Sequence, residues 1–123
     1  MIETMRNFKE LKVWQKAHRM VIEVYRITRA FPSNERYGLV SQLRRSAASV
    51  PANIAEGCGR KGEREFSQFL GIAAGSASET EYHILLAHDL KLIKKDEYIE
   101  LDREINEIKR MLNSFIQKLT PKS

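Results

Sequence analysis

The apolar residues in the last quarter of the chain follow an unbroken spacing of three and four. These residues are Tyr98, Leu101, Ile105, Ile108, Leu112, Phe115 and Leu119, and most positions between them are charged or polar. Residues three and four apart lie on one face of an α-helix, so the spacing predicts an amphipathic helix with a coiled-coil-like apolar stripe. Such a stripe has to be buried against other elements. The sequence therefore predicts a helical protein with a helix-lined core.

Glycines and prolines divide the rest of the chain into three further helices. Only three prolines and six glycines occur, and no segment shows the period-2 alternation of a strand. We predict one domain over residues 1–123, with helices over about 9–30, 34–57, 63–93 and 96–119. The short connections predict an all-α, antiparallel, up-down-up-down four-helix bundle. Pro51 lies inside the second helix and predicts a kink there, or a break at residues 48–50.

The third helix carries a second stripe opposite its core-facing residues. The second stripe consists of Ile72, Gly75, Glu79, Tyr82, Leu86, Leu90 and Ile93. A helix that is apolar on two faces has to be buried on both, and a four-helix bundle covers only one. We therefore expect this stripe to meet another copy of the chain in a homo-oligomer. The alternative is an irregular bundle in which Leu86, Leu90 and Ile93 lie under a loop.

Arg44 and Arg45 are adjacent on the second helix and flank a face of small residues. Paired guanidinium groups can bind carboxylates or phosphates with planar forks of donors. We expect both arginines at the subunit interface, paired with a carboxylate such as Glu56, Glu79 or Glu81. Contact with RNA is the alternative for this pair.

Positive charge is concentrated in the first half of the chain. Residues 1–62 carry 12 Lys and Arg against 5 Asp and Glu, whereas residues 63–123 carry 9 against 11. A basic face is typical of proteins that bind phosphates. The predicted nucleic-acid contacts are the loop cations and three cations of the first helix, namely Arg60, Lys61, Arg64, Lys12, Lys16 and Arg19.

The segment Gly57–Gly62 matches G-x-G-x-x-G. A dinucleotide-binding fingerprint needs a strand before these glycines, and here a helix precedes them. The segment is therefore expected to be a turn between helices, and the alternative is a turn that also holds an anion near the third helix.

Nothing in the sequence indicates an enzyme, a cofactor, a metal site or a small-molecule substrate. His83 and His88 are five apart and point to different faces, and no Ser-His-acid arrangement can be built from the spacing. No apolar run approaches the ~20 residues of a membrane span. The single cysteine, Cys58, is typical of a reducing compartment, so we expect a cytoplasmic protein without a membrane partner.

Several segments together resemble one known family. The resemblance rests on 42–47 (QLRRSA), 50–57 (VPANIAEG), Arg60, Glu65-Phe66, Phe69-Leu70, 73–76 (AAGS), Glu79 and Glu81, with Phe8-Lys9, Leu11, Val13-Trp14 and Ala17 near the start. The chain resembles the four-helix-bundle family named for the 23S rRNA intervening-sequence protein, also called S23 ribosomal protein. The likeness covers about residues 7–119.

The resemblance implies a homopentamer of bundles and a link to intervening sequences within bacterial 23S rRNA genes. A related branch is the accessory protein of diversity-generating retroelements, a basic pentameric barrel that engages nucleic acid and a reverse transcriptase. The family implies no catalytic residues. From the residues and the resemblance we expect a non-enzymatic, oligomeric RNA-binding protein. The alternative is a protein-interaction scaffold that recruits a nucleic-acid-processing partner.

Overall fold

The computed structural model describes residues 6–119. Its four α-helices are α1 (Lys12–Thr28), α2 (Ser41–Cys58), α3 (Glu63–Asp89) and α4 (Lys95–Leu119). Two 3-10 turns, η1 (Phe8–Glu10) and η2 (Ser33–Glu35), and a π-type turn, η3 (Arg36–Val40), complete the helical segments. No strand occurs within residues 6–119, which confirms the predicted all-α fold with four helices.

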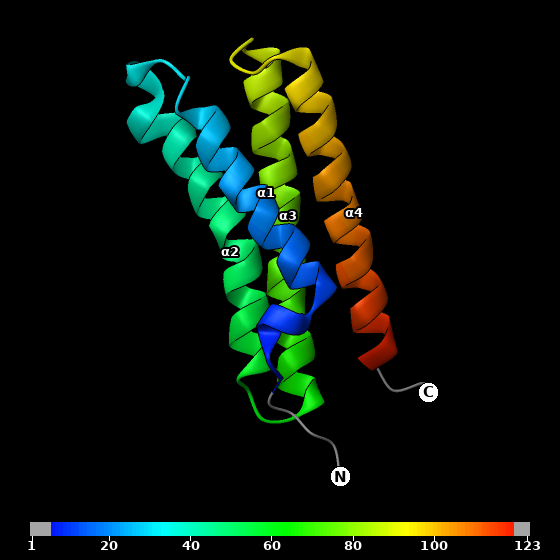
Figure 1. The fold of residues 1–123 in the computed structure, drawn as a ribbon. Helices are drawn as coiled ribbons and strands as arrows, with labels where there is room; N and C mark the ends of the chain where they lie inside the picture. The colour runs from blue at the N-terminus through cyan, green and yellow to red at the C-terminus, as the bar shows by residue number, and fades with distance from the viewer. Residues whose placement is uncertain (1–5, 120–123) are drawn as a thin grey trace.

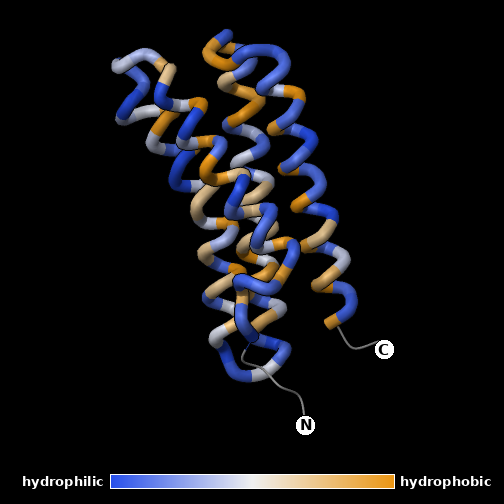
Figure 2. The backbone as a smooth tube through the Cα atoms, viewed as in Figure 1, coloured by the Kyte–Doolittle hydropathy of each residue, from blue (hydrophilic) through white to orange (hydrophobic). Residues whose placement is uncertain are grey.

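The helices lie side by side, with their connections at alternating ends (Figure 1). The α1–α2 and α3–α4 connections lie at one end, and the α2–α3 loop lies at the other, where the chain also starts. Each of α1 and α3 contacts both α2 and α4. Figure 2 shows hydrophobic positions recurring along each helix between hydrophilic ones. This pattern is expected of helices that bury one face each.

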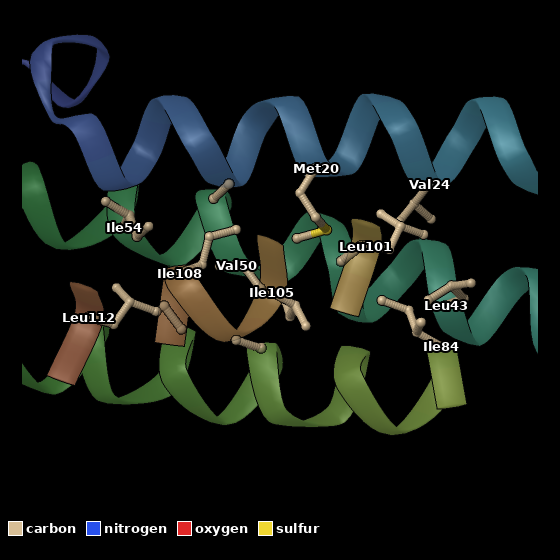
Figure 3. Packing of buried hydrophobic residues seen from close by; sticks show 14 of the residues in the cluster. Met20, Val24, Leu43, Val50, Ile54, Ile84, Leu101, Ile105, Ile108 and Leu112 are labelled. Carbon is tan, nitrogen blue, oxygen red and sulfur yellow. The ribbon is translucent and has the colours of Figure 1, made fainter. Parts of the chain in front are cut away.

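The buried stripes of the four helices meet in one core (Figure 3). Met20 and Val24 of α1 pack opposite residues of α2, α3 and α4 that are almost without solvent exposure. The central residues of the stripe that opened the sequence analysis are all buried, namely Leu101, Ile105, Ile108 and Leu112. The residues at its two ends are half-buried, because the bundle tapers off there.

The helix bounds differ from the predicted ones where turns replace helix. The first helix begins at Lys12, because Leu11 is extended and ends the 3-10 turn that precedes α1. The second begins at Ser41, because η2 and η3 occupy residues 33–40 and Gly38 departs from helical geometry (φ −105°, ψ −108°). The third ends at Asp89, and Lys91 takes a positive φ of 62° directly after it.

Pro51 is buried inside α2, which runs without interruption from Ser41 to Cys58. The alternative of a break at residues 48–50 is therefore wrong. Proline has no amide hydrogen, so the helix lacks one hydrogen bond at this position. The surrounding core holds the segment helical in spite of that loss.

Gly57 belongs to α2 and does not end it. A Cβ on Gly57 would lie 2.9 Å from Phe66 Cδ1 and 2.9 Å from Phe69 Cβ, so only glycine lets α2 and α3 approach this closely. The turn itself is made by Gly62, whose φ of +86° favours glycine. The G-x-G-x-x-G spacing thus joins a packing glycine to a turn glycine.

Candidate nucleic-acid interface

Arg60 has its charge offset by neighbouring carboxylates. Its Nε lies 3.4 Å from Glu56 Oε2 and 4.0 Å from Glu65 Oε1. Its guanidinium also lies 4.8 Å from the centroid of the Phe69 ring, which is a cation–π distance. A phosphate would have to compete with two glutamates for this side chain. Arg60 is therefore a weaker candidate than the sequence indicated.

Lys61 and Arg64 flank the same loop and remain available. Both are exposed, and neither lies within ion-pair distance of a carboxylate among residues 6–119. The nearby carboxylate of Glu63 is instead 3.6 Å from Arg6 Nη2. The loop thus presents two unpaired cations next to the start of α3.

The two predicted cations in the middle of α1 face α4 glutamates. Lys16 Nζ lies 3.3 Å from Glu107 Oε1. Arg19 lines a small hollow with Lys16, Glu104 and Glu107. An anion would meet two carboxylates here, so Lys16 and Arg19 make a poor phosphate site.

Lys12 lies in a groove between the start of α1 and the end of α4. The groove has a volume of about 440 Å³, and apolar side chains form much of its lining. Three cations line it as well, Lys12, Arg110 and Lys118, and no carboxylate of residues 6–119 does. Sequence reasoning missed Arg110 and Lys118, although Arg110, Ser114 and Lys118 are spaced by four and therefore share a helix face.

The structure thus separates the six predicted cations into three settings. One group lies at the α2–α3 loop, one in the α1–α4 groove and one beside the α4 glutamates. The α2–α3 loop and the end of α4, which forms one side of the groove, lie toward the same end of the molecule (Figure 1). Arg6 joins the segment before η1 to the end of α2, since its backbone N–H donates to the carbonyl of Cys58 at 3.1 Å. Five cations of this end form no ion pair with a carboxylate of residues 6–119, and we call them the basic end, namely Lys12, Lys61, Arg64, Arg110 and Lys118.

Arg45 finds its carboxylate within its own chain. Its guanidinium donates to Glu79 on α3 and to Gln42 one turn earlier on α2. Arg44 has no carboxylate partner among residues 6–119, and its Nε donates to Thr28 Oγ1 at 2.8 Å. Arg45 and Glu79 thus pair within one chain, and the place of Arg44 and Arg45 at a subunit interface stays a prediction.

The second stripe of α3 is only partly free. Ile72, Tyr82 and Leu90 are 51%, 57% and 52% exposed. Gly75 is exposed too, and a Cβ there would meet nothing within 4 Å.

Two members of that stripe belong elsewhere. Ile93 is only 9% exposed and packs in the core, because the chain turns after Asp89 and brings it back against the bundle. Leu86 is half-buried against the same core. Leu85 is exposed and was missed by the spacing. We call Ile72, Gly75, Tyr82, Leu85 and Leu90 the α3 stripe from here on.

Ser46, His83 and Glu79 lie together between α2 and α3, although the spacing had given no such arrangement. Ser46 Oγ lies 3.1 Å from His83 Nδ1, and His83 Nε2 lies 3.7 Å from Glu79 Oε2. Ser46 has no solvent exposure, and its hydroxyl also contacts Leu43 O and Thr80 Oγ1. A buried hydroxyl cannot reach a substrate in solution, so we interpret the cluster as a contact that aligns the two helices.

Burial is the main cause of the pKa shifts of His83 and Cys58. Burial lowers the pKa of His83, against the opposing effect of Glu79, and Arg45 lowers it further. Burial raises the pKa of the Cys58 thiol, and Arg6 opposes that shift weakly. Cys58 therefore has little thiolate character near neutral pH.

Within residues 6–119, no group of three His, Cys, Asp or Glu side chains is placed to hold a metal ion. None of the helices in this range combines the length and the apolar character needed to cross a membrane.

Comparison with known proteins identifies the family. The sequence profile described as 23S rRNA-intervening sequence protein matches residues 9–114. A crystal structure of a protein of unknown function from the S23 ribosomal protein family of Bacteroides thetaiotaomicron is similar, with a TM-score of 0.75 and 28% identity. The similarity covers 85% of this chain and 97% of that one. Comparison with curated proteins gives no match. The chain belongs to the 23S rRNA-intervening sequence protein family.

Proposed function

We propose that this chain is a non-enzymatic, oligomeric RNA-binding protein that contacts phosphates through its basic end. The observation that carries the proposal is the α1–α4 groove, where Lys12, Arg110 and Lys118 gather and no carboxylate among residues 6–119 joins the lining. The name of the family, which refers to an intervening sequence of 23S rRNA, makes a structured RNA the natural partner.

Ion pairing supports the choice of this end. The chain pairs cations with carboxylates along its flanks, as in Lys16–Glu107, Arg45–Glu79 and Lys109–Glu81. A paired cation gains little from a phosphate, because it has to give up its own carboxylate. An unpaired cation releases counterions from RNA when it binds a phosphate, which favours association. The basic end therefore offers the larger gain in binding free energy.

The assembly is proposed as a homo-oligomer, with the pentamer that the family resemblance implies. Its building unit is the antiparallel up-down-up-down bundle, with α2 kinked at Pro51. The α3 stripe would form the subunit contact, because it gathers exposed Ile72, Tyr82 and Leu90 on one helix and its C-cap. Burial of this apolar surface would drive association. Arg44 and Arg45 flank this contact on α2 in the proposed assembly, and the proposed setting is the cytoplasm.

A charge-matched comparison tests the RNA site. The triple variant Lys12→Gln, Arg110→Gln, Lys118→Gln removes the groove cations, and the control Lys16→Gln, Arg26→Gln, Arg103→Gln removes three cations that are paired in the structure. Gel-shift titration at about 50 mM salt is expected to show a loss of about tenfold or more for the groove variant and a smaller loss for the control. Equal losses would contradict the placement of the site.

The groove also favours one alternative. Leu11, Met111 and Phe115 give it an apolar lining between the cations, which suits an acidic amphipathic segment of a partner protein. In that case the chain is a scaffold that recruits a nucleic-acid-processing protein. Co-purification of such a protein that survives nuclease treatment and is lost in the groove variant would favour the scaffold over direct RNA binding.

A further inference from the structure

A second cationic pocket lies at the opposite end of the molecule, between the end of α1 and the turns that precede α2. Its volume is about 470 Å³. Arg29, Arg36 and Arg44 line it together with Tyr25, Thr28 and Ser33, and the described part of the chain, residues 6–119, adds no carboxylate to the lining. Among these residues the sequence offered Arg44 as an RNA contact, as the alternative to a subunit interface, but it did not predict the pocket itself.

The fold brings the three arginines together from three segments. Arg29 follows the last residue of α1, Arg36 begins η3, and Arg44 lies in the first turn of α2. The reversal of the chain between α1 and α2 places them around one hollow. Because the three arginines belong to separate segments, the pattern within any one helix does not reveal the pocket.

Arg44 is held in place by residues of α1. Its Nε donates to Thr28 Oγ1 at 2.8 Å, and the Thr28 hydroxyl donates in turn to Val24 O at 2.7 Å. The guanidinium lies 4.5 Å from the centroid of the Tyr25 ring. A stacked and hydrogen-bonded guanidinium loses little freedom when it binds a ligand, so this arginine is prepared for an anion.

The charge of the pocket is not offset by the protein. Arg29, Arg36 and Arg44 make no ion pair with any carboxylate among residues 6–119. Glu35, next to Arg36 in the sequence, does not line the pocket, and its carboxylate accepts from the backbone N–H of Leu39 at 3.4 Å. Like charges around one hollow repel each other, and a bound anion removes that cost.

We propose that this pocket binds the phosphate group of a nucleotide or of an RNA chain. Guanidinium forks match the oxygens of phosphate, and the Ser33 hydroxyl lines the pocket as a further donor. The volume exceeds that of a phosphate, so a sugar and base can extend past the anion along the Tyr25 wall. Binding of an RNA chain in this pocket rests on the proposed function, whereas binding of a free nucleotide does not.

Calorimetric titration of the full chain tests the pocket directly. Inorganic phosphate and 5′-AMP are expected to bind at low salt, whereas adenosine is not. The variant Arg29→Gln, Arg36→Gln should weaken 5′-AMP binding by about tenfold or more, since each charged hydrogen bond contributes substantially. The control Lys16→Gln, Arg103→Gln removes equal charge from two ion-paired side chains outside the pocket and should leave 5′-AMP affinity within about twofold. Absence of binding by both phosphate compounds, or equal losses in the two variants, would overturn the proposal.

A pair of RNA oligonucleotides with and without a 5′-phosphate separates the two sources. Tighter binding of the phosphorylated RNA, lost in Arg29→Gln, Arg36→Gln, identifies an RNA end as the ligand. Equal RNA binding together with 5′-AMP binding identifies a free nucleotide. If no RNA binds but 5′-AMP does, the pocket stands and the proposed function fails. If RNA binds but neither phosphate nor 5′-AMP does, the pocket fails and the proposed function stands.

Discussion

The hydroxyl of Ser46 and Nδ1 of His83 lie 3.1 Å apart between α2 and α3. Thr80 extends this contact, with its Oγ1 at 3.0 Å from Ser46 Oγ. A second polar contact joins Ser49 and Ser76, whose hydroxyl oxygens are 2.8 Å apart. Buried and partly buried polar pairs of this kind specify how two helices are aligned, because a shift along the helix would leave each group without its partner.

Acidification is expected to destabilise the fold through His83. Burial lowers the pKa of His83 in the folded chain below its usual value of 6.5, so the folded state favours the neutral ring. His83 contributes its full stabilisation when the pH is above its pKa in the unfolded chain. As the pH falls from that value through the lower pKa in the folded chain, this contribution is lost. The measurement is the free energy of unfolding in urea between about pH 7.5 and 5.

Two glutamine variants isolate the contribution of His83. His83→Gln removes the titrating ring, so its stability should decline less over the same pH range than that of the unmodified chain. His18→Gln removes an exposed histidine that stacks on Trp14, and it should keep the full decline. An identical pH dependence in all three proteins would show that His83 does not control it.

Gly57→Ala is expected to lower the free energy of unfolding by about 1–3 kcal/mol, as overpacking does. The added methyl would lie 2.9 Å from Phe66 Cδ1 and 2.9 Å from Phe69 Cβ, so the two helices have to move apart. Chemical denaturation measures the change.

Gly71→Ala is the matched control on α3. A Cβ on Gly71 would meet nothing within 4 Å, and alanine is the better helix former. This variant should gain about 0.5–1 kcal/mol. A Gly57→Ala protein as stable as Gly71→Ala would disprove the close approach of α2 and α3.

Substitution of the α3 stripe is expected to dissociate the oligomer without loss of helix. Leu90→Glu and Tyr82→Glu replace exposed apolar side chains with a charged one. The folding stability of the single chain should change little, whereas burial of the charge in an interface should strongly weaken association. Light scattering should give a multiple of 14.3 kDa for the unmodified protein and a single chain for these variants.

Ile22→Glu provides the control for this experiment, since Ile22 is exposed to a similar degree on α1. It should leave the assembly intact, and circular dichroism should show equal helix content in all variants. An unmodified protein that is a single chain at micromolar concentration would contradict the oligomer.

Helical periodicity was sufficient to predict the elements and most of the core. Leu101, Ile105 and Ile108 are buried as their spacing predicts, because packing follows directly from which face a residue occupies. The same spacing was misleading at Ile93, since a periodic pattern continues past the point where the chain turns. Element ends depend on turn geometry, which short sequence patterns specify weakly.

Contacts between distant segments were not accessible from the sequence. The sequence left Glu56, Glu79 and Glu81 open as carboxylate partners of Arg44 and Arg45, and the fold places Glu79 beside Arg45 of its own chain. The groove needs Lys12 and Lys118 from opposite ends of the chain to be brought together. Periodicity describes one helix at a time. It therefore does not predict which helices pack together, and that packing creates both the Arg45–Glu79 contact and the α1–α4 groove.

The salt dependence of RNA affinity tests the central claim most directly. We assume that Lys12, Arg110 and Lys118 each neutralise one phosphate. A plot of the logarithm of the association constant for single-stranded RNA against the logarithm of salt concentration should then have a slope of about −2 or steeper. Affinity would then decrease about twentyfold between roughly 50 and 200 mM salt, and the slope should flatten in the groove variant. An affinity that does not change over this range, or no binding at the lowest salt, would contradict phosphate-led recognition.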